Sequence, residues 1–398
     1  MSSRKTPFIV GLLIIYTLSS NLPAQSYERP PVRPIPSEIQ SSRYNFTVVK
    51  IKTNSGEAEK LAYLKAGSAF GVSRVQGLVT KYSLSEKNQL THSNIGKVTL
   101  NKALPTSDIL RIENSKFHNG YLYTAITTKP DTDNCSFLIL VRQKYFESRI
   151  LEPATKVFQS DCDRSQNDTW GGGMAFNKNL MYLSIGENRI SYKTAKQFTK
   201  FYTKKQLERK NTYFGKVISI NLLNFNDKQI ISMGHRNPTG LYFDSNSSIL
   251  YASEFGPEGG DEINLILKGK DYGYPETSFG RIYDEINPGI KSKFPMGYLN
   301  YFKYTTPLIS YVPSINPVQL FVVNDLSEFK DWRKNLIVGC LSGKILRIVL
   351  DNDENGSKVI LSEQIEFGAR IRDLTEISNS SLLASTDDGL LVLMSIQN

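Results

Sequence analysis

The chain repeats one short unit, in which a turn residue precedes a brief apolar strand that ends in small or acidic residues. The unit recurs five times, at 119–125, 179–184, 248–253, 335–339 and 381–386. Strand-rich units that recur at intervals of about 45 to 90 residues are typical of a β-propeller with insertions. Residues 61–79 are a candidate for a sixth unit. We therefore predict an all-β propeller, with a Gly- and Pro-rich β-sandwich as the structural alternative.

Length and composition are compatible with one large all-β domain. A chain of 398 residues has room for about two or three average domains, but a single all-β domain can also be this long. The hydrophobic fraction is 40%, with 21 Tyr and 20 Phe, which supplies enough core to exclude a disordered protein. We predict a single propeller domain at 45–398.

The N-terminus has the pattern of an export signal. Arg4 and Lys5 precede an apolar run at 7–18, and Ala24 is a suitable cleavage point. The run is shorter than the ~20 apolar residues that a membrane span needs. We predict a signal peptide at 1–24, with an uncleaved anchor as the alternative, followed by a Pro-rich leader at 25–44. The mature protein is then periplasmic or secreted.

Positive charge is concentrated in one segment. The net charge is +10, and residues 188–211 carry eight lysines and arginines against a single acid, Glu208. Such a strip can attract a polyanion, but we interpret it as a solvated surface insert. No recognised nucleic-acid motif accompanies it, so no nucleic-acid partner is expected.

Three cysteines are present. Cys135 and Cys162 lie near the ends of neighbouring strand candidates, so an oxidising compartment would permit a disulfide between them. Cys340 lies inside the apolar run 336–341 and is expected to be a buried free thiol.

Residues 234–275 gather the groups of a candidate site. Arg236 and Asn237 precede Pro238, which cannot continue a central strand, so they are expected where a strand ends. Glycines at 256, 259 and 260 form a loop whose backbone can approach a ligand closely. Asp261 and Glu262 follow at once. Free carbonyls beside carboxylates suit calcium, which accepts main-chain oxygens.

A second candidate element is the sequence Arg370-Ile371-Arg372. Alternate residues of a strand lie on the same side, so both guanidiniums are expected on one face. Two guanidiniums in that arrangement can bind a carboxylate group through several hydrogen bonds. Salt bridges on the surface or between blades are the alternative.

Several ordered motifs together resemble the soluble glucose/sorbosone (aldose sugar) dehydrogenases, from about residue 169 to the C-terminus. They are GHRNP at 234–238, SEFGPEGGDEINLI at 253–266, DYGYP at 271–275, PSINP at 313–317 and RIRD at 370–373. The resemblance implies a six-bladed propeller that uses pyrroloquinoline quinone and calcium to oxidise an aldose or a related sugar alcohol. It also implies that carbonyls of Gly256 and Pro257 ligate calcium. Arg236, Asn237, Arg370 and Arg372 would hold the quinone.

The chain departs from the family pattern at the residues that carry out catalysis in the family. Thr169 stands where the family has a general-base His, and Gly173 stands where it has an Arg. A threonine hydroxyl is not a base near neutral pH, whereas imidazole titrates in that range. Ser342 replaces a cofactor-contacting Lys, with Lys344 two residues further on.

Two functions are therefore open. One is sugar oxidation by a quinoprotein, with Asp163 or Asp168 as nearby carboxylates in place of the His. The other is a non-catalytic exported propeller that binds a ligand, a carbohydrate or a protein. The sequence does not specify the substrate, the electron acceptor or the oligomeric state.

Overall fold

Almost all of the described chain is β-structure. The computed structural model describes residues 33–100, 108–129, 136–151, 153–163, 170–187, 212–257, 259–274, 276–280, 303–353 and 356–397. These residues form 27 strands and one short 3₁₀ helix, Lys330–Trp332. Among them, no helix is long and apolar enough to cross a membrane.

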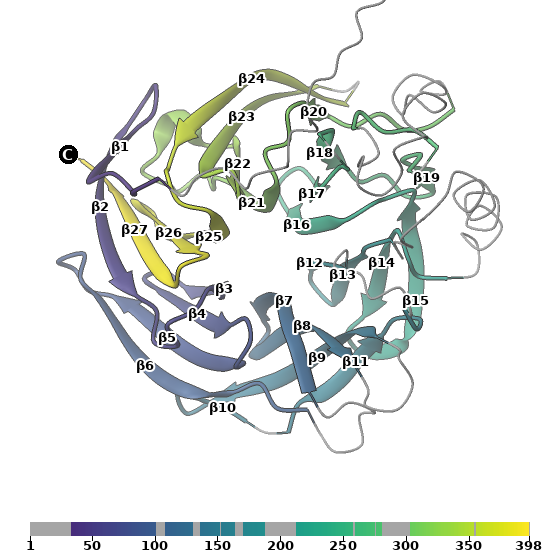
Figure 1. The fold of residues 1–398 in the computed structure, drawn as a ribbon, viewed down its shortest axis with the longest axis horizontal. Helices are drawn as coiled ribbons and strands as arrows, with labels where there is room; N and C mark the ends of the chain where they lie inside the picture. Colours follow the sequence, from purple (N-terminus) through teal and green to yellow (C-terminus); the bar gives the residue numbers. More distant parts are fainter. Residues whose placement is uncertain are drawn as a thin grey trace, which may run out of the picture. The chain divides into compact units, whose positions relative to one another are not determined.

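The strands form six sheets, which are the blades of a propeller (Figure 1). Blade 1 contains β3 (Glu59–Lys65), β4 (Ser68–Ser73), β5 (Leu78–Leu84) and β6 (Leu90–Lys97). Blade 2 contains β7 (Asp108–His118), β8 (Tyr121–Lys129), β9 (Phe137–Phe146), β10 (Arg149–Ile150) and β11 (Thr155–Gln159). Blade 3 contains β12 (Gly171–Asn177), β13 (Leu180–Ile185), β14 (Lys216–Asn221), β15 (Asn224–Met233) and β19 (Lys270–Asp271).

The second half of the chain supplies the remaining three blades. Blade 4 contains β16 (Pro238–Asp244), β17 (Ile249–Glu254), β18 (Asp261–Leu265) and β20 (Ile309–Tyr311). Blade 5 contains β21 (Pro317–Val322), β22 (Leu336–Cys340), β23 (Lys344–Asp353) and β24 (Gly356–Glu366). Blade 6 contains β25 (Ile371–Ser378), β26 (Ser381–Thr386) and β27 (Leu390–Ile396), together with β1 (Glu38–Gln40) and β2 (Asn45–Lys52).

Blade 6 closes the ring, because it joins the two ends of the described chain. β2 pairs antiparallel with β27 over seven residue pairs, from Phe46 opposite Ile396 to Lys52 opposite Leu390. Because strands from both ends of the described chain pair in one sheet, the ring of blades is closed. β1 begins at Glu38, so the end of the range predicted as a Pro-rich leader forms an edge strand of blade 6.

The predicted six-bladed propeller is confirmed, and the repeated unit has a structural meaning. The five units found in the sequence contain β8, β13, β17, β22 and β26, and the sixth candidate contains β4. Each of these is the second strand of its blade. Every residue of β4, β22 and β26 is buried, because a second strand is covered on both faces by the neighbouring blades. That burial explains the short apolar runs.

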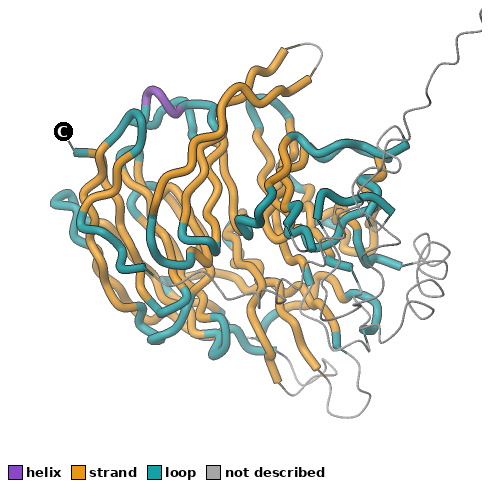
Figure 2. The backbone as a smooth tube through the Cα atoms, turned by 45° about the horizontal axis from the view of Figure 1, so that its top comes forward, coloured by secondary structure: helices purple, strands orange, loops and turns teal. Residues whose placement is uncertain are grey.

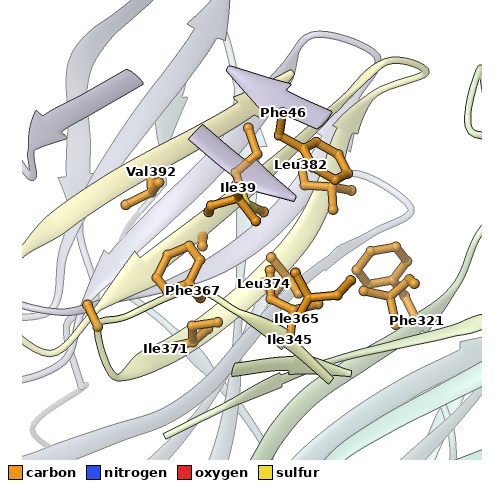
Figure 3. Close-up of a cluster of buried hydrophobic side chains, with 14 of the residues drawn as sticks. Ile39, Phe46, Phe321, Ile345, Ile365, Phe367, Ile371, Leu374, Leu382 and Val392 are labelled. Atoms are coloured by element: carbon orange, nitrogen blue, oxygen red, sulfur yellow. The ribbon is translucent and has the colours of Figure 1, made fainter. Parts of the chain in front are cut away.

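The largest apolar cluster lies between blades 5 and 6 (Figure 3). Phe367, Ile371 and Leu374 are fully buried there, and β1 and β2 add Ile39 and Phe46. A well-packed cluster at the closing blade opposes opening of the ring, since each fully buried side chain of this size contributes about 1.5–3 kcal/mol.

The first strand of each blade lines the centre of the propeller (Figures 1 and 2). These innermost strands are β3, β7, β12, β16, β21 and β25, and each contacts the next around the ring. In five of them the pairing with the second strand shifts register close to the start of the strand. The shifts are β-bulges, which leave a residue without a cross-strand partner and re-aim its side chain.

The cysteines agree in part with the prediction. Cys162 is disulfide-bonded and Cys340 is a free, fully buried thiol. Cys135 lies outside the described residues, so its pairing with Cys162 stays a prediction. Ser136 and Asp163 form an antiparallel bridge, with main-chain hydrogen bonds of 2.7 and 2.9 Å. Ser136 follows Cys135 in the sequence and Asp163 follows Cys162, so the bridge pairs the residues next to the two predicted partners. The basic segment 188–211 and the predicted signal peptide also lie outside the described residues.

Candidate functional site

A positively charged cavity lies at the ends of the innermost strands where the chain enters them. Its volume is about 250 Å³. The described residues that line it include five cations and one carboxylate: Lys60, Arg74, Arg111, Arg236, Arg372 and Glu113. We call it the cationic cavity. An excess of four positive charges in one cavity favours a ligand with several negative charges.

Arg236 lies in the loop between β15, which ends at Met233, and β16, which begins at Pro238, and it is 6% exposed. Its Nη1 donates hydrogen bonds to the carbonyls of Phe255 at 2.9 Å and Gly256 at 2.6 Å. Its Nε lies 3.9 Å from Oε1 of Glu187. The guanidinium therefore holds the glycine loop against the start of β16 while it lines the cavity.

A buried polar network fixes the main chain at Arg236. Nδ1 of His235 lies 2.9 Å from Oε2 of Glu254, and its Nε2 lies 2.8 Å from Oγ of Ser232. The main-chain N–H of Arg236 donates to the other oxygen of Glu254. This connectivity is that of a serine–histidine–acid triad. Ser232 and His235 are each 1% exposed, however, and they do not line the cationic cavity. The network is therefore a support for Arg236.

Asn237 joins three segments at the cavity wall. Its Oδ1 accepts a hydrogen bond of 2.9 Å from the N–H of Gly171, and its carbonyl accepts one of 3.1 Å from the N–H of Phe255. Its Nδ2 has no hydrogen-bond partner among the described residues, and the residue lines the cavity. Asn237 therefore offers a donor to a ligand from a rigidly held position.

The predicted calcium loop is built around a buried carboxylate. Oδ1 of Asp261 accepts from the N–H of Gly256 at 2.8 Å, and Oδ2 accepts from the N–H groups of Ile315 and Asn316 at 2.8 and 2.6 Å. Asp261 thus stabilises the loop, and burial raises its pKa although these hydrogen bonds lower it. The loop keeps the carbonyl of Gly256 at the cavity.

A calcium ion at this loop would depend on main-chain oxygens. No cluster of three or more His, Cys, Asp and Glu side chains suited to a metal occurs in the part of the chain that the structure describes. Gly256 lines the cavity, whereas Pro257 follows it in the loop and is not among the lining residues. The carbonyl of Gly256 already accepts from Arg236 and has a second lone pair. A hard cation at this loop would therefore need further oxygen ligands from a bound molecule.

Arg370 and Arg372 converge on one carboxylate, with Arg370 just before β25 and Arg372 in the bulge of that strand. Nε of Arg370 donates to Oδ2 of Asp387 at 2.7 Å, and Arg372 donates to both oxygens through Nε and Nη2. Burial raises the pKa of Asp387, but the hydrogen bonds and charges of the two arginines outweigh it and lower that pKa below its usual range. Arg372 lines the cavity and Arg370 does not.

The departures from the family pattern are partly visible. Thr169 and Asp168 lie outside the described residues, and Asp163 is 2% exposed and does not line the cavity. A Cβ at Gly173 would lie 2.8 Å from Oγ of Ser184 and 3.0 Å from the main chain of Gly240, so this position has no room for a side chain. Lys344 is directed to blade 5 itself, with its Nζ 2.7 Å from Oε1 of Gln364.

Four cavity residues come from blades 1 and 2, where the motif match is thin. They are Lys60, Arg74, Arg111 and Glu113. Burial lowers the pKa of Lys60 to about 8 and that of Arg74 to about 10. The Nζ of Lys60 donates to the carbonyl of Arg372 at 3.1 Å, and Nε of Arg74 has no partner among the described residues. No periodicity or motif marks these positions. They lie at one cavity only because the blades close into a ring.

A second cavity, of about 370 Å³, lies at the opposite ends of the innermost strands. It is lined by later residues of the same strands, such as Lys116 of β7, Gln319 of β21 and Glu376 of β25. Its aromatic lining residues are Tyr63, Phe117, Phe176, Tyr242, Phe243 and Phe321. We call it the aromatic cavity.

Comparison with known families identifies the fold family. The family described as glucose/sorbosone dehydrogenase matches residues 70–393, which is most of the chain. The chain belongs to the glucose/sorbosone dehydrogenase family. The match begins at residue 70, well before residue 169, so it includes most of blade 1 and all of blade 2, where the motifs are thin.

Individual relatives are similar over parts of their lengths. The chain is 30% identical to the aldose sugar dehydrogenase YliI of Escherichia coli (strain K12) over 251 residues, which are 61% of this chain and 64% of that protein. It is 36% identical to the quinoprotein glucose dehydrogenase B of Acinetobacter calcoaceticus over 137 residues, 30% of this chain and 26% of that protein. The matches thus span less than two thirds of these relatives.

Solved structures share the fold. The PQQ-bound form of the aldose sugar dehydrogenase from Streptomyces coelicolor superposes with a TM-score of 0.62 at 18% identity. The superposition covers 92% of this chain and 100% of that structure. At this identity the similarity supports the propeller fold of the glucose/sorbosone dehydrogenase family.

Proposed function

We propose that this chain is an exported quinoprotein that oxidises an aldose or a related sugar alcohol and binds pyrroloquinoline quinone with calcium in the cationic cavity. The observation that carries the proposal is the charge of that cavity, five cations against one carboxylate, at a loop that presents the carbonyl of Gly256. The cofactor is a tricarboxylate, and a polyanion of this kind requires cations around it.

Each residue has a role in this proposal. Arg236 and Asn237 hold the quinone edge from the start of β16, and Arg372 binds a carboxylate from β25, with Arg370 positioning it through their shared Asp387. The carbonyls of Gly256 and Pro257 ligate calcium. When bound, pyrroloquinoline quinone would supply a hydride acceptor, and calcium would supply a Lewis acid. Trp170 and Phe255 exclude water from the cavity wall.

Reconstitution tests this function. Purified protein is mixed with calcium and pyrroloquinoline quinone, cofactor uptake is followed by absorbance, and dye reduction is assayed across a panel of aldoses. Uptake with turnover supports the proposal. Protein without calcium and protein with calcium alone are the controls. Failure to take up the cofactor contradicts the proposal at its first step.

A ligand-binding propeller without catalysis is the second candidate, and the residue Thr169 at the family's base position favours it. In that case the cofactor or another polyanion binds in the cationic cavity, but no aldose reduces it. Binding with a shifted absorbance spectrum and no dye reduction at any aldose would support this alternative. Export itself is tested by N-terminal sequencing of the mature protein, which should begin after Ala24.

A further inference from the structure

We propose that Glu113 is the proton acceptor of the cationic cavity, the group that takes the hydroxyl proton of the alcohol that is oxidised. This inference rests on the proposed function and names a residue that the motifs do not mark. Among the described residues that line the cavity, Glu113 carries the one carboxylate. Among the other lining side chains, burial lowers the pKa of Lys60 to about 8, and its Nζ donates to the carbonyl of Arg372. The rest are guanidinium, aromatic, apolar or amide groups, or the hydroxyl of Thr239.

The carboxylate is held by one oxygen and free at the other. Its Oε1 accepts hydrogen bonds from Nε of Arg111 at 2.8 Å and from Oγ1 of Thr127 at 2.6 Å. Its Oε2 has no hydrogen-bond partner among the described residues. Two donors on one oxygen fix the orientation of the group, and they leave a lone pair of Oε2 available for a proton.

A β-bulge aims this side chain at the cavity. In blade 2, Ile112 pairs with Ile126 and Asn114 pairs with Ala125, so Glu113 is the extra residue between them. Bulges recur beside active sites because they redirect a side chain. Arg372 occupies the same position in the bulge of β25, between Ile371 and Asp373, and it lines the same cavity.

The neighbouring blade leaves room for this carboxylate through a glycine. Gly172 has φ of +90°, and a Cβ there would lie 2.7 Å from Cβ of Glu113. Any larger residue would collide with Glu113 and would also be strained in this conformation. Glycine at 172 and glutamate at 113 are therefore geometrically linked across blades 2 and 3.

Charged groups surround Glu113 on several elements. Arg111 contacts it from β7, and Lys60 of β3 and Arg74 after β4 interact with it electrostatically. Arg236 and Arg372 line the same cavity. When a polycarboxylate occupies the cavity, its negative charges offset these cations. Glu113 then faces the substrate with less positive charge opposing proton transfer.

The proposed oxidation breaks two bonds of the substrate alcohol. The carbinol C–H bond of the sugar breaks, and its hydrogen leaves with both electrons as hydride to the quinone oxidant. The O–H bond breaks, and its proton forms a bond to Oε2 of Glu113. The carbinol carbon becomes a carbonyl, the quinone is reduced by two electrons, and the carboxylate becomes a neutral acid until solvent removes the proton.

The test is Glu113→Gln in protein loaded with calcium and pyrroloquinoline quinone. Single-turnover reduction of the bound cofactor by an aldose should slow by about 10²- to 10⁴-fold, as expected for loss of a general base. The amide oxygen still accepts from Arg111 and Thr127, so the fold is retained. Because a negative charge is lost from the cavity, cofactor affinity measured by titration should increase. Slower reduction with tighter binding is the expected signature.

Two further variants sharpen the test. Glu113→Asp keeps the carboxylate but withdraws it by one methylene, so its rate should lie between those of the wild type and Glu113→Gln. Glu376→Gln, in the aromatic cavity, is the matched control and should change neither rate nor affinity. If Glu113→Gln reduces the cofactor as fast as the wild type, the proton-acceptor role is wrong and sugar oxidation stands. If the wild type binds cofactor without any reduction, both the role and the oxidation are wrong.

Discussion

The two ends of the propeller channel are built from the same six strands, yet they differ in chemistry. The cationic cavity has five cationic side chains and a carboxylate, whereas the aromatic cavity has six aromatic residues with Lys116 and Glu376. The register of the innermost strands also differs between the ends. At the cationic end, bulges in β7 and β25 free Glu113 and Arg372 from regular pairing.

The difference indicates how a propeller makes a site. In a regular strand, successive side chains alternate between the two faces, which the neighbouring blades cover. A bulge breaks this alternation and directs a side chain to the axis. At the aromatic end, β7, β12, β16 and β21 pair in regular register, and side chains such as Phe176 and Phe243 form the wall. Register shifts also occur at the aromatic end, in β3 between Tyr63 and Lys65 and in β25 between Glu376 and Ser378. Function is therefore expected at the cationic end, where five of the innermost strands shift register.

The largest effect expected in this comparison is that of Arg236→Ala on cofactor binding. Arg236 lines the cationic cavity and braces the loop through the carbonyls of Phe255 and Gly256. Hydrogen bonds to charged groups contribute about 1.5–3 kcal/mol each, so affinity for pyrroloquinoline quinone should fall by about 10²-fold. Titration by absorbance or calorimetry measures the change.

Lys344→Ala is the control for Arg236→Ala. It removes one positive charge from a side chain that is paired with Gln364 and Glu366 and does not line the cavity. Affinity should stay within about twofold of the wild type, because this partly exposed charge lies outside the cavity and is screened. Equal losses in the two variants would mean that net charge, and not the cavity, determines binding.

A smaller effect is expected from Asp387→Asn, which relieves the negative charge shared by Arg370 and Arg372. One charge removed near a bound polyanion is worth about 1 kcal/mol in a partly solvated setting, so affinity should rise about fivefold. Weaker binding would instead show that Asp387 acts chiefly by orienting Arg372.

Asp387→Asn also has a pH signature. Because the folded-state pKa of Asp387 is lowered, its ionised form contributes stability above the ordinary pKa of 3.8, and that stability is lost as pH falls through the folded pKa. The asparagine variant should therefore have a Tm less sensitive to acid below about pH 4. Thermal unfolding across this range measures it.

The sequence predicted more of the fold than of the site. Second strands are short and buried on both faces, so their apolar runs recur and reveal the blades; β22 is an example, with all five residues buried. Arg236, Asn237 and Arg372 were found because they lie in dense motifs. Glu113 was missed because a bulge cannot be read from residue types, and its partner Gly172 lies in another blade. Nothing in the spacing of Arg370 and Arg372 indicated that Asp387 joins them.

Glu262 of β18, which follows the glycine loop, should also make stability depend on pH. The pKa of Glu262 is raised from 4.5 to about 8. Burial is the larger cause, and repulsion from Glu254 adds to it. The folded state thus binds this proton more tightly than the unfolded state. Stability is fully present below pH 4.5 and falls as pH rises toward 8. Glu262→Gln should flatten Tm between pH 5 and pH 8 by about a few degrees, while an unchanged slope would exclude Glu262 as its source.

Lys116→Met should have the smallest effect on the cationic cavity and tests whether the two ends are independent. Lys116 and Arg111 are five residues apart on β7, which is about 17 Å along a strand and beyond a Debye length of about 8 Å at physiological salt. Cofactor affinity should therefore change less than twofold. Burial lowers the pKa of Lys116, and the charge of Asp373 offsets this in part. A protonated lysine there costs folding energy, so methionine should raise Tm at neutral pH. A marked loss of cofactor affinity would instead mean that the channel couples its two ends electrostatically.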